Sequence, residues 1–449
     1  MLINYSNYLE KIVYNGKIHS VGVTIGGRPM KAFTKLNKDE LQTLKKTLDQ
    51  RYQEFKALDL KLDMSRGKPC SEQLDLSMPI LDMKEYAVDN IDCRNYGGLE
   101  GLPSMRRLFA QLLEVNENNV IIGGTSSLTL MYDYIAQAML LGVCGNKPWS
   151  KLEKVKFLCP VPGYDRHFAF CEHFGIQMIN VPMTDNGPNI DVIKELIKDE
   201  SVKGMFCVPK YSNPQGITYS DETVKALAAL TPAAKDFRII YDNAYCVHDL
   251  DKQGDILLNI FDELPKYNNE DLVIMVASTS KITFAGGGVS CIVASDNNLN
   301  DIKKRLRFQS ISQDKMNQLR HFKFFENVEG VKAHMQKQAT ILKPKFDCVI
   351  NYLNNELADK DIASWYVPHG GYFISLDIMP GCAKRVGQLC KEAGVVLTNI
   401  GATFPYGNDP QDSNIRIAPS YPPIDELSKA AKLLCICVQI AAIEKLLIK

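Results

Sequence analysis

The chain has 449 residues, of which 45% are hydrophobic and 23% are charged, a composition typical of soluble globular proteins. Its 52 Lys and Arg residues balance its 52 Asp and Glu residues, so a basic surface for nucleic acid is not expected. A chain of this length exceeds a single compact core, which predicts about two or three domains. These values favour a small-molecule partner.

The 13 cysteines are scattered and form no Cys-x-x-Cys pair, so their spacing predicts neither a zinc site nor a disulfide framework. We expect reduced thiols in a cytoplasmic protein. The N-terminal segment lacks the basic start, apolar stretch and cleavage site of a signal peptide. No apolar run reaches about 18 residues, so no membrane span is predicted.

After a helical pattern at residues 36–58, seven short apolar runs alternate with helical stretches between about residues 117 and 295. Such alternation predicts an α/β domain whose mostly parallel sheet is covered by helices on both faces. The predicted strands are residues 120–124, 155–161, 176–181, 202–208, 237–242, 272–278 and 289–295. The predicted helices between them include residues 126–140, 191–199 and 221–230.

The C-terminal part has a different pattern, with a helical segment at 330–360 and a closing helix after Pro423. The strand-like segments between these helices are residues 370–378, 394–400 and 413–420. This mixture predicts a smaller α+β domain. We expect a large domain at 80–328 and a small domain formed by 1–79 and 329–449.

Polar residues follow several of the predicted strands, at the sheet edge where α/β proteins bind ligands. Gly124, Thr125 and Ser126 stand between a strand and a helix, where free N–H groups can hold a phosphate. The alternative is an ordinary turn with a hydroxyl helix cap. Tyr164 follows a proline-rich turn and could stack on a flat heterocycle, and His167 could brace an acid. A surface loop is the alternative for these two residues.

Asp242 and Lys281 each follow a predicted buried strand. A lysine amine can form a Schiff base with a cofactor aldehyde, and an acid can keep a pyridine nitrogen protonated. A helix-capping aspartate and a solvated surface lysine are the alternatives. Asn213 lies in an Asn-Pro turn. Arg416 is flanked by isoleucines in a predicted strand, where it could bind a carboxylate or face outward.

The order of these motifs resembles that of fold-type I pyridoxal phosphate enzymes, specifically the class I aminotransferases, over roughly residues 60–420. The segments CRNYGGLEGLPSMRRLF, CPVPGYDRHFAF, CVPKYSNPQG and STSKITFAGGGV resemble the bacterial aspartate aminotransferase subgroup often filed with MocR-type aminotransferase domains. The resemblance implies pyridoxal 5'-phosphate as cofactor and a homodimer with shared active sites.

The resemblance also implies a role for each matching residue. Lys281 would bind the cofactor aldehyde and then move the substrate Cα proton as base and acid. Asp242 would pair with the ring nitrogen, with His167 supporting it. Asn213 and Tyr245 would hydrogen-bond the phenolic oxygen of the cofactor.

The remaining implied contacts concern the ring face, the phosphate and the substrate. Tyr164 would stack on the ring, and Tyr96 would reach the phosphate of the partner subunit's site. Arg416 would bind the substrate α-carboxylate near the Gly67 backbone. The residues implied in phosphate binding are Gly124, Thr125, Ser126 and Ser278.

One position departs from the family pattern. Many class I members have a phosphate-binding arginine eight residues after the lysine, and Val289 occupies that position here. Helix N–H groups, hydroxyls or a cation from elsewhere would have to replace it.

The resemblance favours transamination between L-aspartate and 2-oxoglutarate, which requires a cation for the distal carboxylate. Arg320 is the first candidate, with a surface or subunit-contact charge as its alternative; Arg66 and Lys315 are further candidates. Other functions to consider are an aminotransferase or β-lyase for another amino acid, and a ligand-sensing MocR-type regulator domain. The regulator is disfavoured because the aminotransferase pattern begins by about residue 60, leaving little room for a DNA-binding domain.

Overall fold

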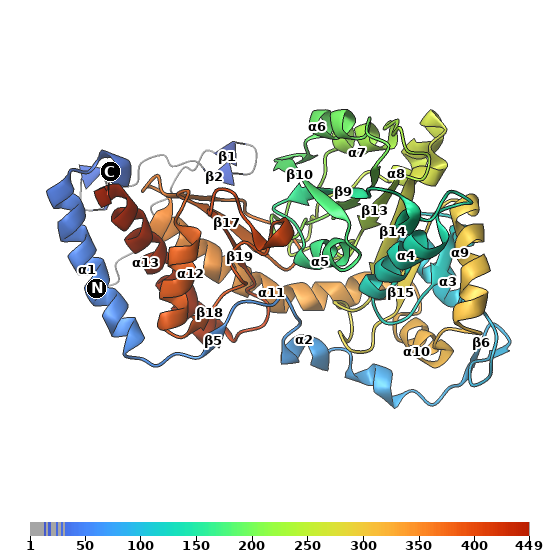
Figure 1. The fold of residues 1–449 in the computed structure, drawn as a ribbon. Coiled ribbons are helices and arrows are strands. Elements are labelled where there is room, and N and C mark those ends of the chain that lie inside the picture. Colours follow the sequence, from blue (N-terminus) through green and yellow to red (C-terminus); the bar gives the residue numbers. More distant parts are fainter. Residues whose placement is uncertain (1–12, 15–16, 19–23, 26–27, 30–31, 449) are drawn as a thin grey trace.

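The computed structural model describes residues 13–14, 17–18, 24–25, 28–29 and 32–448. Two lobes are visible in Figure 1, one around an eight-stranded sheet and the other around a three-stranded sheet. The N-terminal segment, for which no signal peptide is predicted, lies mostly outside the described residues. None of the described helices is long and apolar enough to cross a lipid bilayer.

The large sheet has the strand order β11-β10-β9-β12-β13-β14-β15-β8. All seven predicted strands belong to it, and the two-residue strand β11 adds an antiparallel edge that was not predicted. Strands β10, β9, β12, β13 and β14 run parallel, whereas β15 is antiparallel to both of its neighbours. The strand bounds are Val120–Ile122 (β8), Lys156–Val161 (β9), Gln177–Thr184 (β10), Gly187–Pro188 (β11), Val202–Cys207 (β12), Arg238–Asp242 (β13), Val273–Ser278 (β14) and Ser290–Val293 (β15).

Helices cover both faces of this sheet, as its uninterrupted apolar strands predict. Alternate residues of β13 illustrate the two faces: Ile239 and Tyr241 enter one core, and Ile240 enters the other. The first core is closed by α3 (Pro103–Leu113), α6 (Ile190–Leu196), α7 (Asp221–Ala228), α8 (Ile260–Glu263) and α10 (Lys315–Phe325). The second is closed by α4 (Ser127–Leu141), α5 (Asp165–His173) and α9 (Asp296–Gln309).

The long helix α11 (Val328–Leu357) joins the two lobes (Figure 1). Its first turns pack in a large-sheet core, and its later turns pack in the core of the small lobe. That lobe contains an antiparallel sheet of β16 (Ala363–Trp365), β17 (Ile374–Ile378) and β19 (Asn414–Ile417), together with α12 (Ala383–Glu392) and α13 (Ile424–Ile448).

The N-terminal part of the described chain also packs into the small lobe. Helix α1 (Lys38–Lys56) contributes buried side chains to its core, and β5 (Leu62–Asp63) pairs in parallel with β18 (Val395–Val396). The predicted strand 394–400 is therefore reduced to two residues that pair outside the three-stranded sheet. The domain bounds of 80–328 for the large domain and of 1–79 with 329–449 for the small domain stay a prediction. Most of residues 1–31 lie outside the described ranges.

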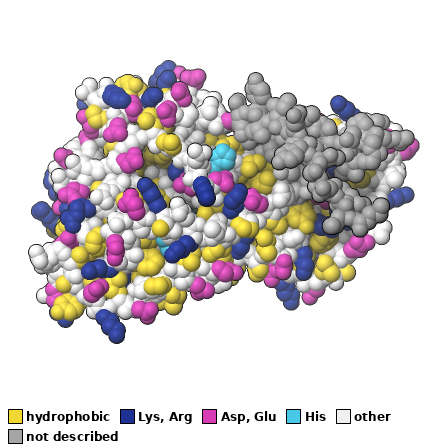
Figure 2. Space-filling model, turned by 180° about the vertical axis from the view of Figure 1, so that it is seen from behind, with side chains coloured by type: hydrophobic (Ala, Val, Ile, Leu, Met, Phe, Trp, Pro, Cys, Tyr) yellow, Lys and Arg dark blue, Asp and Glu magenta, His cyan; other side chains and the backbone are white. Residues whose placement is uncertain are grey.

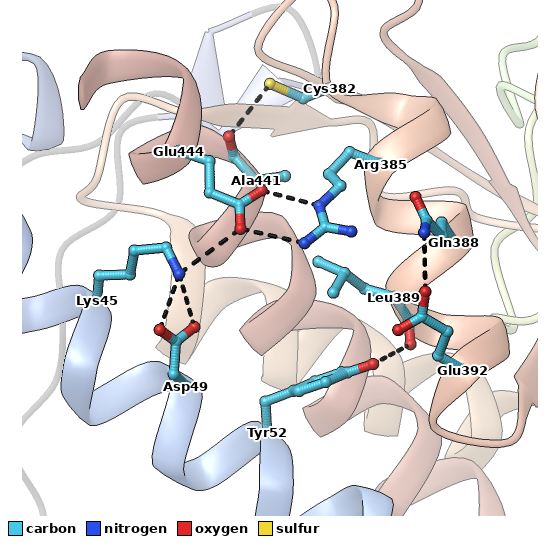
Figure 3. A network of polar contacts seen from close by, with 10 residues as sticks. All are labelled: Lys45, Asp49, Tyr52, Cys382, Arg385, Gln388, Leu389, Glu392, Ala441 and Glu444. Carbon is cyan, nitrogen blue, oxygen red and sulfur yellow. Dashed lines mark hydrogen bonds and ion pairs between the residues drawn. The ribbon is translucent and has the colours of Figure 1, made fainter. Parts of the chain in front are cut away.

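A polar cluster joins α1, α12 and α13 (Figure 3). Glu444 lies at its centre and accepts hydrogen bonds from Arg385 at 2.8 and 3.2 Å. Lys45 lies 3.6 Å from Glu444 and bonds Asp49 on its own helix at 2.8 Å. The Tyr52 hydroxyl donates to the Leu389 carbonyl at 2.9 Å. These contacts fasten the N-terminal helix to the C-terminal half of the small lobe.

The remaining elements are short. They are β1 (Val13–Tyr14), β2 (Lys17–Ile18), β3 (Thr24–Ile25), β4 (Arg28–Pro29), α2 (Ser71–Asp75), β6 (Ala87–Val88), β7 (Ile91–Asp92) and seven 3₁₀ turns in the described part of the chain. On the face in Figure 2, outside the grey residues, basic and acidic side chains are interspersed. This distribution agrees with the zero formal net charge.

Candidate active site

A buried acid lies at the carboxyl end of the central strand β13. Asp242 is 3% exposed, and its Oδ2 lies 3.1 Å from Nε2 of His167 on α5. The His167 ring is itself stacked on Phe206 of the neighbouring strand, with centroids 4.4 Å apart and planes 12° apart. The other oxygen, Oδ1, is buried and has no hydrogen-bond partner among the residues that the structure describes. A buried carboxylate oxygen without a donor is costly, so this position suits a cationic N–H group of a bound molecule.

Lys281 follows β14, the strand next to β13. Its Nζ lies 5.0 Å from the centroid of the Tyr245 ring. Burial lowers the pKa of the Lys281 amine, while the nearby charge of Asp242 acts in the opposite direction. A lysine in this environment has more neutral, nucleophilic amine at neutral pH than a solvated one.

The loop carrying Lys281 is bonded to the turn before α4. Ser280 Oγ donates to the Thr125 carbonyl at 2.8 Å, and the Ser290 amide donates to the Gly124 carbonyl at the same distance. Ser126 caps α4 by accepting from the Leu128 amide at 3.2 Å. The helix cap that was the alternative to phosphate binding at this turn is therefore present.

The turn before α4 leaves open space beside its backbone. A Cβ added to Gly124 would meet no atom within 4 Å, so the space beside this backbone is open. Ser278, the last residue of β14, donates to Ser280 at 3.2 Å. Val289 is buried among apolar residues, and its amide bonds Thr279, so the position of the missing arginine offers no charge. Helix N–H groups and hydroxyls remain as donors for a phosphate here.

Arg416, on β19 of the small lobe, faces the same region and is buried. Its NH1 group donates to Asp165 Oδ1 at 2.9 Å and to Asn213 Oδ1 at 3.2 Å, and its Nε lies 3.4 Å from Thr398 Oγ1. The guanidinium also lies 4.8 Å from the centroid of the Phe373 ring. Arg416 therefore does not face outward, which was the alternative to carboxylate binding, and its binding role stays a prediction.

Gly67 lies beside this arginine. A Cβ on Gly67 would come within 2.4 Å of the Phe373 ring, which itself lies under the Arg416 guanidinium. Only glycine permits this close approach without displacing the ring. The structure thus brings two residues predicted to bind the substrate carboxylate, which are distant in sequence, close together.

Two tyrosines line the space between Asp242 and Arg416. Tyr164 packs edge-on against His167, with centroids 4.9 Å apart, and Tyr245 packs against Tyr372 at 6.2 Å. Burial raises the pKa of both Tyr164 and Tyr245, with the Asp242 charge adding to each shift. Their hydroxyls therefore stay protonated at neutral pH and can donate hydrogen bonds.

The three residues predicted as candidates for binding the distal carboxylate are not bonded to Arg416 in the described part of the chain. Among residues 32–448, no hydrogen bond or ion pair links Arg66, Lys315 or Arg320 to Arg416. Arg320, on α10, has a buried Nε without a hydrogen-bond partner, Lys315 is buried, and Arg66 is exposed. Tyr96 is 79% exposed, which is compatible with a contact outside its own chain.

Three residues around Arg416 were not predicted from the sequence: Asp165, Thr398 and Phe373. Asp165 immediately follows the predicted stacking residue Tyr164, which is the only available signal for it. Thr398 and Phe373 lie near Arg416 only because of the way the small lobe folds, which the sequence pattern does not indicate.

A family model described as aspartate amino-transferase matches residues 36–449. An aspartate aminotransferase from Corynebacterium glutamicum is 44% identical over 404 residues, covering 88% of this chain and 93% of the relative. A Mycolicibacterium smegmatis protein that carries an aminotransferase name is 44% identical over 424 residues, covering 93% and 99% of the two chains. A solved aspartate transaminase structure from C. glutamicum superposes with a TM-score of 0.90 at 42% identity, covering 92% of this chain and 99% of the other.

Proposed function

Because the chain belongs to the aspartate aminotransferase family, we propose that it transfers the amino group of L-aspartate to 2-oxoglutarate with pyridoxal 5'-phosphate as cofactor. Its fold is that of the fold-type I aminotransferases, and enzymes of this fold act on amino acids and 2-oxo acids. The aspartate aminotransferase name of a 44% identical relative supports aspartate as donor.

The unpaired Oδ1 of Asp242 is the observation that carries the cofactor proposal. It is a buried acid oxygen with no donor, next to a lysine whose pKa is lowered by burial and an open turn at a helix N-terminus. A protonated pyridine nitrogen, an aldehyde and a phosphate match these three features in turn. The residues therefore fit pyridoxal phosphate.

When bound, this cofactor supplies an aldehyde that condenses with amines and a protonated ring that withdraws electrons from the substrate Cα. Asp242 would hold the ring nitrogen protonated, because its negative charge stabilises an adjacent cation in a buried site. His167 would orient Asp242 through its contact with Oδ2. Tyr164 would cover the ring, and Gly124 with its neighbouring hydroxyls would hold the phosphate.

Lys281 would move the substrate proton. Its amine, when free, would remove the proton from the substrate Cα as a base and would afterwards donate it as an acid. The lowered pKa increases the neutral amine available for the first step. Asn213 and Tyr245 would donate hydrogen bonds to the phenolic oxygen. Arg416 would bind the substrate α-carboxylate bidentately.

We further propose a cytoplasmic homodimer in which the exposed Tyr96 reaches the partner subunit's site. The distal carboxylate of aspartate needs a cation, and Arg320 is proposed for it because its Nε lacks a partner in the described residues. Replacement by Arg320→Gln would then raise the KM for aspartate more than the KM for alanine.

A coupled assay for oxaloacetate tests the substrate proposal. The purified protein, supplied with pyridoxal phosphate, is given L-aspartate and 2-oxoglutarate, and kcat/KM is compared with values for alanine, aromatic and sulfur amino acids. The highest value is expected for aspartate. No turnover of aspartate, with efficient turnover or β-elimination of another donor, would replace the proposed substrate while leaving the cofactor proposal intact.

A further inference from the structure

The proposed carboxylate-binding arginine is already paired with a carboxylate of its own chain. Arg416 NH1 donates to Asp165 Oδ1 at 2.9 Å, which forms an ion pair between the two lobes. The side chain of Arg416 is only 6% exposed, so a guanidinium here requires a counter-charge. Asn213 and Thr398 supply neutral oxygens, and Asp165 supplies the negative charge.

Asp165 is placed so that it can leave this contact. Its side chain is 35% exposed, in contrast to Arg416, so it has access to water. It is the first residue of α5, and a negative charge in the first turn of a helix is stabilised by the unpaired N–H groups there. Release of Asp165 therefore costs less than release of a fully buried partner would.

A substrate carboxylate that binds Arg416 bidentately needs two neighbouring N–H groups of the guanidinium. Within the described residues, the NH1 group is used by Asp165 and Asn213 and Nε faces Thr398, so a carboxylate that binds bidentately through NH2 must share NH1 or Nε with one of these partners. Two carboxylates on one guanidinium edge would repel each other. The incoming carboxylate and Asp165 thus compete for the same cation.

We propose that Asp165 is an internal competitor of the substrate: it neutralises Arg416 in the empty site and is displaced when an α-carboxylate binds. The inference rests on the proposed role of Arg416. Its consequence is a weakened affinity for every carboxylate ligand, because only the fraction of molecules with Arg416 released can bind. Asp165 is accordingly a residue that sets the affinity of the site for carboxylates through its contact with Arg416.

The test measures the dissociation constant of succinate, a dicarboxylate without an amino group to transfer. Calorimetric titration of the cofactor-loaded enzyme compares the wild type with Asp165→Asn, which keeps the size and the acceptor oxygen but removes the charge. Asp165→Ser is the second variant. Glu172→Gln removes the same charge from an exposed position of the same helix and serves as the control. Arg416→Lys is measured in parallel.

The expected result is succinate binding about fivefold tighter in both Asp165 variants, as loss of a competing, partly exposed ion pair of ~1 kcal/mol implies. Glu172→Gln should bind like the wild type, and Arg416→Lys should bind more weakly. Unchanged or weaker binding in the Asp165 variants, with weaker binding in Arg416→Lys, would overturn the competitor role alone. Unchanged binding in Arg416→Lys would instead refute the proposed carboxylate site.

Discussion

His167 holds only one of the two oxygens of Asp242, and the second is left for a bound molecule. The imidazole ring of His167 is also stacked on Phe206. Because this ring contacts Asp242 Oδ2, the Asp242 carboxylate has little freedom to move. A carboxylate oriented in this manner can hold a cation at a defined position, which is what the proposed chemistry requires.

Replacing His167 by Phe should preserve the stacking but remove the contact with Asp242. A hydrogen bond to a charged group contributes ~1.5–3 kcal/mol, so kcat should fall about 10- to 100-fold. Steady-state kinetics with saturating cofactor measures this change. His173→Asn, at an exposed position of the same helix, should retain activity. Equal activity of His167→Phe and the wild type would show that Asp242 does not depend on this partner.

The contact between His167 and Asp242 was predictable, because the carboxyl ends of parallel strands share one sheet edge, where an acid that ends one strand can meet a histidine that follows another. The pairing of Asp165 with Arg416 was not. These residues belong to different lobes, and neither periodicity nor spacing indicates how an arginine in a small-lobe strand meets a helix of the large lobe. The functional roles of all these residues stay predictions.

Helix α10 braces the loop that carries the lysine. Asn317 Nδ2 donates to the carbonyls of Gly287 and Gly288 at 3.0 and 2.9 Å, and His321 lies 2.8 Å from Thr283 Oγ1. The loop has three successive glycines, so its own backbone preferences restrict it weakly. Its conformation therefore depends on these contacts with α10.

Asn317→Ala should loosen this loop. Each lost hydrogen bond contributes ~0.5–1.5 kcal/mol, so cofactor affinity should fall about 5- to 100-fold. Hydrogen exchange of the amides in 282–289 should accelerate in parallel. Lys323→Ala on the same helix is the control. Fast exchange in the wild-type loop, indistinguishable from that in the variant, would contradict the bracing role.

At the level of helices and strands, the large sheet was the most predictable part. Its strands are buried on both faces and therefore appear as apolar runs, which the sequence displays directly. The strands β11, β5 and β18 have two residues each, which is too short for a run of hydrophobic residues to predict a strand. Their pairing depends on which chain segments the packed helices bring together.

The small lobe contains residues from the N-terminal and the C-terminal parts of the described chain. The polar cluster around Glu444 holds α1 against α12 and α13 (Figure 3). Hydrogen bonding by Arg385 lowers the pKa of Glu444, so the ionised form is favoured in the folded protein. The stabilisation is therefore present above the ordinary glutamate pKa of 4.5 and is lost as the pH falls through the lower folded value.

Glu444→Gln should lower the free energy of unfolding by ~0.5–1 kcal/mol at pH 7, because its partners are partly exposed. Urea unfolding should show this difference at pH 7 and a smaller one below pH 4. Glu54→Gln, on the exposed face of α1, is the control. A difference that stays constant across this pH range would show that the charge of Glu444 contributes nothing.

The whole molecule places an acid and an amine from neighbouring strands of one lobe opposite an arginine from the other lobe. Every step of the proposed chemistry depends on Lys281 as the residue that binds the cofactor. Reduction of the cofactor-loaded protein with borohydride, followed by digestion and peptide mass mapping, tests it directly. We predict a phosphopyridoxyl group on Lys281 and none on any peptide of Lys281→Ala. Attachment at another lysine, or none in the wild type after incubation with pyridoxal phosphate, would contradict the account.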